Sequence, residues 1–151
     1  MATYTLSGND TVIFNQTVFE DFPNGKIVEV SWDDTLVEQK VGKNGNIISV
    51  YKPSGKKAKV VLRLLRSSAD DILVNSKLEQ MSIDFPSFKL LTLTLNKRFG
   101  DGAGNVKNDN MILTGGLIGK VPAMSTDIDG DTEQSVISYE MTFGSFVRTI
   151  S

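Results

Sequence analysis

The sequence predicts a mainly β fold with one flanking α-helix at about residues 67–80 and one long protruding hairpin at about residues 39–66. Short runs in which apolar and polar residues alternate recur along the chain, and clusters of Gly, Asn, Asp and Pro separate them. Only one stretch combines helix-capping residues with a long enough apolar side. With 151 residues, of which 40% are hydrophobic, the chain has the size and composition of a single domain covering residues 1–151.

Alternation within the strand-like runs predicts which side chains form the core. In residues 57–66, one face is apolar from Ala58 to Leu64, whereas the opposite face mixes basic with apolar side chains. Leucines alternate with threonines over residues 91–95, and the run SVISYEMTF at 135–143 alternates in the same way. The face that carries Ala58, Val60, Leu62 and Leu64 is expected to belong to the core. The two glycines of LTGGL, at 115 and 116, predict a bulge or a close approach of two backbones.

The predicted helix has a clear beginning. Ser67 or Ser68 is placed to act as the N-cap, and Asp70 and Asp71 lie in the first turn, where a carboxylate favours the positive end of the helix dipole. A helix of about four turns needs packing against a sheet to be stable, so we expect it to lie on one side of the strands.

The predicted hairpin carries an unusual charge. Residues 39–66 contain eight basic residues and no Asp or Glu, which leaves eight basic against 18 acidic residues in the rest of the chain. We expect residues 47–51 to run through a turn at KPSG, residues 52–55, and to pair with residues 57–66. A basic hairpin on an acidic body indicates a negatively charged partner.

Three interpretations of this hairpin remain open from the residues alone. It can contact another copy of the same chain, it can be an inert edge whose lysines prevent aggregation, or it can bind nucleic acid. Tyr51 is its only aromatic residue, no known nucleic-acid-binding motif accompanies it, and the net charge of the chain is −2. These observations weaken the third interpretation, in which the chain is a small nucleic-acid-binding protein that uses residues 40–66, but it stays the alternative function.

Composition argues against an enzyme. The chain has no His and no Cys, which excludes the commonest general base, the commonest zinc ligands and every thiolate mechanism. The glycine-rich loop GDGAGN at 100–105 is expected to join two strands and not to cradle a nucleotide. The run DIDGDTE at 127–133 lacks the spacing of a calcium loop and is expected to be an acidic turn. We expect no cofactor and no metal site. No apolar run reaches the roughly 20 residues of a membrane span, and the N-terminus lacks the pattern of a signal peptide.

The order of motifs along the chain resembles that of tail tube proteins from contractile-tailed bacteriophages, which are similar to type VI secretion tube proteins. The resemblance extends over about residues 7–148 and rests on the succession of GKNGN, LRLLRSSADDILV, KRFGDGAGNV, LTGGLIGK and DGDTEQSVISYEMTFG. It implies an antiparallel β-sandwich or partly open barrel with one flanking helix. In that family, six copies form a ring that lines a lumen with one continuous β-barrel. Rings stack by inserting a long hairpin and the chain termini into the next ring.

The resemblance also implies a function and a set of partners. The chain would be a structural subunit of a phage tail tube and would conduct genomic DNA during ejection without binding it specifically. Its partners would be copies of itself, the tail sheath, the baseplate and the tail terminator, with no membrane. The protein would be made in the host cytoplasm and reside in the tail of the virion.

Two groups of residues are predicted to serve this assembly. The first group pairs the basic hairpin with the acid-rich segment 121–147 of a neighbouring copy, because opposite charges favour a head-to-tail contact. The predicted inter-ring contacts are Lys43, Asn44, Lys52, Lys56, Lys57, Lys59, Asp127, Asp129 and Asp131. The second group is acidic, because a channel for DNA should repel phosphate. The predicted lumen-lining residues are Glu29, Asp33, Asp34 and Glu38, although the alternation in this region permits either face of the strands to turn inward.

Overall fold

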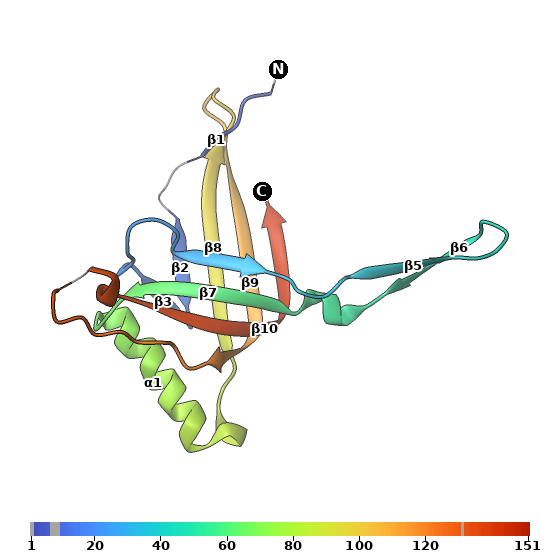
Figure 1. Ribbon diagram of the computed structural model, residues 1–151. Helices are drawn as coiled ribbons and strands as arrows, with labels where there is room; N and C mark the ends of the chain where they lie inside the picture. Colours follow the sequence, from blue (N-terminus) through green and yellow to red (C-terminus); the bar gives the residue numbers. More distant parts are fainter. Residues whose placement is uncertain (1, 7–9, 131) are drawn as a thin grey trace.

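The computed structural model describes residues 2–6, 10–130 and 132–151 (Figure 1). Its strands are β1 (Thr5–Leu6), β2 (Thr11–Phe14), β3 (Thr17–Phe19), β4 (Val28–Ser31), β5 (Val37–Val41), β6 (Ile47–Tyr51), β7 (Ala58–Leu65), β8 (Leu91–Gly100), β9 (Val106–Lys120) and β10 (Val136–Ile150). Its α-helix is α1 (Ala69–Ile83), and short 3-10 helices are η1 (Pro53–Lys56), η2 (Phe85–Ser87) and η3 (Thr132–Ser135). No helix within the described ranges has the length and hydropathy needed to cross a membrane.

One antiparallel sheet forms the body of the protein. Its strand order is β3-β2-β8-β9-β10-β7-β4, and β1 also pairs with β8. The hairpin of β8 and β9 rises toward the N-terminus in Figure 1, whereas β7 and the first half of β10 run across it. One part of the sheet contains β8 and the other contains β7, and the long strands β9 and β10 extend through both parts. The sheet therefore bends over itself but does not close. This arrangement confirms the expected mainly antiparallel, partly open architecture.

The core lies on the concave side of the bent sheet. Alternate residues of the long strands are fully buried, as the sequence pattern predicts. The apolar faces of β7 and β10 form one continuous surface, because the two strands are neighbours in the sheet. Leu62 is the cross-strand partner of Tyr139, and Val60 is the partner of Met141. The buried core residues are Val12, Phe14, Phe19, Ala58, Val60, Leu62, Leu64, Val74, Leu91, Leu93, Leu113, Ile118, Ile137, Tyr139, Met141 and Phe143.

The predicted bulge lies where β9 turns from one part of the sheet into the other. Gly115 has a φ of 70°, and the register between β8 and β9 shifts next to Leu91. A Cβ atom at Gly116 would collide with the ring of Phe143, which is itself fully buried. The glycine pair therefore serves both the bend of the strand and the close packing of β9 against β10.

Helix α1 begins as the sequence predicts and ends three residues later than expected. The Ser68 hydroxyl accepts a hydrogen bond from the backbone N–H of Asp71 at 3.3 Å and is the N-cap. The helix ends at Ile83, three residues before Pro86, because a residue that precedes proline is disfavoured in the helical conformation.

Both first-turn carboxylates of the helix are buried and hold it to the sheet. Asp70 accepts hydrogen bonds from the backbone N–H groups of Glu20 and Asp21, each at 2.9 Å. Asp71 accepts one from the Tyr139 hydroxyl at 2.5 Å and one from the Ser67 N–H at 2.8 Å. Burial, and the neighbouring Asp71 carboxylate, raise the pKa of Tyr139 well above its ordinary value. The sequence predicted that these carboxylates lie near the positive end of the helix dipole. It did not predict which groups in the rest of the fold they bind.

The protruding hairpin exists, but its predicted strand pairing is wrong. β6 pairs with β5 and not with β7, so the turn is at residues 42–46 and the arm comprises residues 37–51. The segment at 52–55, predicted as the hairpin turn, lies at the foot of the arm and leads into η1. β7 instead lies inside the main sheet between β10 and β4, because its apolar face is needed for the core.

Candidate assembly surfaces

The arm is a two-stranded ribbon that extends away from the body (Figure 1). All ten residues of β5 and β6 are exposed. Its strand register places Val37 opposite Tyr51 and Val41 opposite Ile47 on one face, with the hydrogen-bonded pair of Gln39 and Ser49 between them. A hairpin of two strands is at best marginally stable alone in water, so this apolar face is a surface that needs a partner.

Few of the predicted basic contacts lie on the arm. Lys43 and Asn44 form part of its exposed tip. Lys40 lies on the other face of the arm from Val41. Lys52, at the foot, forms an ion pair with Glu38 at 2.6 Å, and this pair holds the pKa of Glu38 below its ordinary range. The arm is therefore less basic and more apolar than the sequence indicated, because its partner strand is β5 and not the lysine-rich β7.

The other predicted bases lie at the foot of the arm and on the body. Lys56 is in η1, Lys57 follows it, and Lys59 is on the outward face of β7. Glu29 of β4 is on that same face, because its cross-strand partner is Val61, two residues along β7 from Lys59. The structure therefore brings a predicted lumen residue and a predicted ring-contact residue onto one face that carries both signs of charge.

The remaining predicted lumen residues do not gather with Glu29. Asp33 and Asp34 lie in the exposed connection between β4 and β5, and Glu38 is on the arm in its ion pair with Lys52. The four acidic side chains thus come from three different parts of the chain, and they form no single acidic surface.

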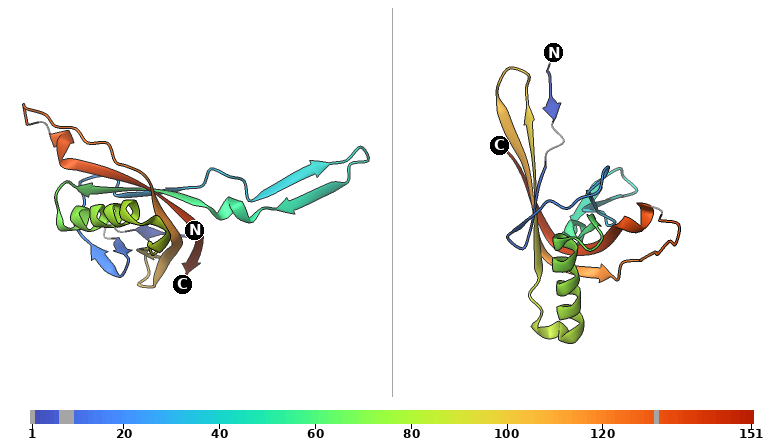
Figure 2. Two further views of the ribbon diagram at one scale, coloured as in Figure 1. Left: turned by 90° about the horizontal axis from the view of Figure 1, so that it is seen from below. Right: turned by 90° about the vertical axis from the view of Figure 1, so that its left-hand side faces the viewer.

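The acidic segment is a loop at the end of the body. Asp127 and Asp129 are joined within it, since the Asp127 carboxylate accepts a hydrogen bond from the Asp129 N–H at 2.9 Å. Asp131, the third predicted acidic contact, lies outside the described residues. Within the described part of the chain, no group of three or more acidic side chains is arranged to hold a metal ion. Figure 2 shows this loop and the tip of the arm at opposite ends of the molecule.

Besides the edge strand β4, two further borders of the main sheet have no strand partner within the described chain. β10 pairs with β7 only as far as Phe143, and beyond it the segment 145–150 pairs with β9 alone. At the far border, β1 pairs only with β8 and β3 only with β2. Free main-chain N–H and C=O groups along such borders favour the addition of a strand from another chain. Local sequence patterns do not predict where these borders lie, because their position depends on how far each pairing extends.

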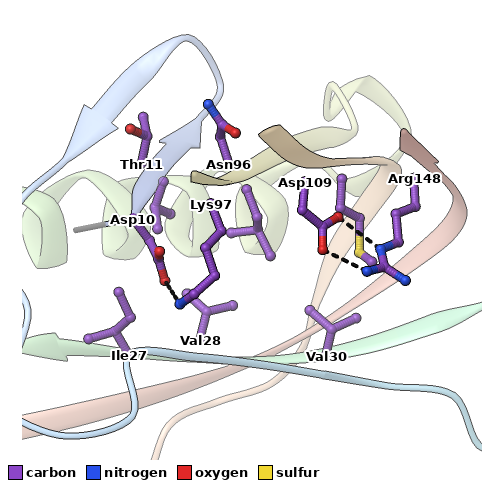
Figure 3. A pocket seen from close by; sticks show the side chains of 12 residues that line it. Asp10, Thr11, Ile27, Val28, Val30, Asn96, Lys97, Asp109 and Arg148 are labelled. Carbon is purple, nitrogen blue, oxygen red and sulfur yellow. Dashed lines mark hydrogen bonds and ion pairs between the residues drawn. The ribbon is translucent and has the colours of Figure 1, made fainter. Parts of the chain in front are cut away.

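A cleft of about 300 Å³ lies between β4 and the concave side of β8, β9 and β10 (Figure 3). One wall is apolar and is formed by β4. Across from it, Lys97 binds Asp10 at 3.0 Å, and Arg148 binds Asp109 through two hydrogen bonds of 2.6 and 2.8 Å. The arginine lowers the pKa of the Asp109 carboxyl. These four charges therefore neutralise one another in pairs.

Comparison with known proteins identifies the fold. No family model and no curated protein sequence matches this chain. Among solved structures, it is similar to a chain of the sheath–tube complex of PVC, an extracellular contractile injection system in its extended state. The TM-score is 0.63, with 12% identity over 94% of this chain and 88% of the other. It is also similar to the sheath/tube terminator of the same system, with a TM-score of 0.59 and 12% identity over 94% of each chain.

These two neighbours show that the chain has the fold of tube-like proteins from contractile systems. The resemblance noted in the order of sequence motifs is therefore confirmed at the level of the fold. Both neighbours belong to an extracellular contractile injection system in its extended state.

Proposed function

We propose that this chain is the structural subunit of a bacteriophage tail tube, in which rings of six copies stack into a hollow rod that conducts genomic DNA. The observation that carries this proposal is the arm. Every residue of its two strands is exposed, and it presents an apolar face that the body does not cover. A lone monomer would leave this face in water, whereas a stacked assembly provides a partner for every copy but those at its end.

Ring closure in this proposal uses the free borders of the main sheet. The segment 145–150 of one copy would pair with the border formed by β1 and β3 in the next copy, so that the strands continue around the ring. This contact is heterologous, because it joins two different edges, and a heterologous contact closes into a ring when its rotation allows. Closing the ring removes free edges that would otherwise promote aggregation.

Stacking of rings would use the arm. The arm and the acidic loop at Asp127 and Asp129 lie at opposite ends of the molecule, which suits a head-to-tail contact between successive rings (Figure 2). The apolar face of the arm supplies most of the binding energy in this scheme, and Lys43 at the tip supplies charge complementarity to the acidic loop of the neighbour. The sheath, the baseplate and the tail terminator would be the further partners, and the tail of the virion the location.

Purified protein tests this proposal directly. Sedimentation velocity and negative-stain electron microscopy at increasing protein concentration should reveal rings and hollow filaments. The Lys56→Glu and Lys57→Glu double variant should fold as a monomer and form fewer filaments at low salt, because it places negative charge at the foot of the arm. A protein that sediments as a monomer at every concentration would refute the proposal.

A further inference from the structure

The convex face of the sheet part formed by β3, β2, β8, β9 and the second half of β10 is almost free of charge. Its side chains are those that alternate with the buried core residues, and they point away from the core. The outward residues of these strands are Thr11, Ile13, Val18, Thr92, Thr94, Asn96, Arg98, Val106, Asn108, Asn110, Ile112, Thr114, Ser145, Val147 and Thr149. Arg98 is the one charged residue in this set, which contains no carboxylate.

The strand register arranges these side chains in rows that cross the sheet. Direct cross-strand partners form one mainly aliphatic row, which consists of Val18, Ile13, Thr94, Ile112 and Val147. The adjacent row consists of Thr11, Asn96, Asn110 and Thr149. The next row contains Arg98 and its partner Asn108, whose backbone pairs with that of Ser151.

We propose that this face lines the channel of the tube and that Arg98 is its contact for the phosphate backbone of a polyanionic cargo. The inference rests on the proposed function, because it requires the strands to continue from one copy to the next. If they do, each row becomes a belt around the channel: an aliphatic belt, then a belt of amides and hydroxyls, then a belt of arginines.

Two observations favour this face over the outward face of β4 and β7. The free borders at β1, β3 and the end of β10 belong to the sheet part that carries the rows, so this part is the one that can be extended on both sides. The outward face near β7 is partly overlain, since residues 120–123 form a shallow pocket there with Val61 and Glu140.

The charge of the rows decides the class of cargo. A wall without carboxylates does not repel phosphate, and one exposed arginine in each copy attracts it. The amides and hydroxyls between the arginine belts are neutral and make weak, exchangeable hydrogen bonds. This lining differs from the acidic one predicted from the sequence, and it favours a nucleic acid that is held lightly at one belt per ring.

The absence of cysteine from the chain permits a labelling test of the lining. Val147→Cys places a thiol at a position that is 60% exposed in the isolated chain. In assembled tubes, this thiol should react with N-ethylmaleimide but not with a maleimide attached to a globular protein too large for the channel. In disassembled protein it should react with both. If the bulky reagent labels it in tubes, or if neither reagent does, the assignment of this face is overturned. Failure to form tubes at all would instead refute the proposed function.

Nuclease protection tests the role of Arg98. Tubes are assembled with a fluorescent DNA duplex and treated with nuclease, and the protected DNA is measured between 50 and 200 mM salt. For each phosphate contacted, affinity should fall about threefold over this range, and Arg98→Gln should remove that dependence and lower protection at 50 mM. Arg63→Gln, on the outward face of β7, is the matched control and should behave as the unmodified protein. Equal protection by Arg98→Gln tubes would overturn the arginine contact and would favour an uncharged polypeptide cargo.

Discussion

The apolar face of the arm makes the sharpest prediction for assembly. Val41 and Ile47 face each other across the arm and are 68% and 63% exposed, respectively. Complete burial of such a side chain is worth roughly 1.5–3 kcal/mol, so burial of the part still exposed contributes about 1–2 kcal/mol for each residue. The Val41→Ser and Ile47→Ser double variant should therefore weaken each arm contact by about 2–4 kcal/mol, or roughly 30- to 700-fold in the association constant.

Sedimentation velocity over a concentration series measures this shift, and thermal unfolding of the monomer serves as the control for folding. Because both side chains are exposed in the isolated chain, the melting temperature of the body should change little. Lys43→Ser is the matched control at the tip: its effect should be small and should disappear at high salt, since an exposed ion pair contributes about 0–1 kcal/mol. The reasoning is refuted if the double variant assembles at the same concentration as the unmodified protein.

Three further predictions concern the body. Tyr139→Phe removes the hydrogen bond to the buried Asp71 carboxylate and should destabilise the monomer by about 1.5–3 kcal/mol, measured by urea unfolding. Gly116→Ala should cost about 1–3 kcal/mol in the same assay, because its Cβ would meet a fully buried ring. The Arg148 side chain lowers the pKa of Asp109 from its ordinary 3.8. The carboxylate therefore contributes stability above about pH 4 that is lost as the pH falls through its folded-state pKa, and Asp109→Asn should flatten that acid limb of the stability curve.

Local patterns in the sequence were sufficient to predict the core faces and the helix start. In β7, the alternation from Ala58 to Leu64 identifies the buried side chains, and Ser68 is the N-cap. These features depend on neighbours a few residues apart, where periodicity and capping chemistry act directly.

The pairing of the arm could not be predicted in the same way. Two turn-forming clusters, at 42–46 and 52–55, border the strand β6, and either one is chemically suited to a hairpin. What decides between them is that the apolar face of β7 completes the core against β10, a segment some 80 residues further along the chain. The extent of the free edge at 145–150 and the tertiary partners of Asp70 also follow from contacts that are distant in sequence.

The position of the arm in an assembled particle tests the proposed stacking of rings most directly. A cryo-electron microscopy reconstruction of the purified protein at high concentration and low ionic strength should show hollow stacked rings, with Val41 and Ile47 covered by a neighbouring copy. A particle in which the arm projects freely into solvent, or a sample that contains only monomers, would contradict it.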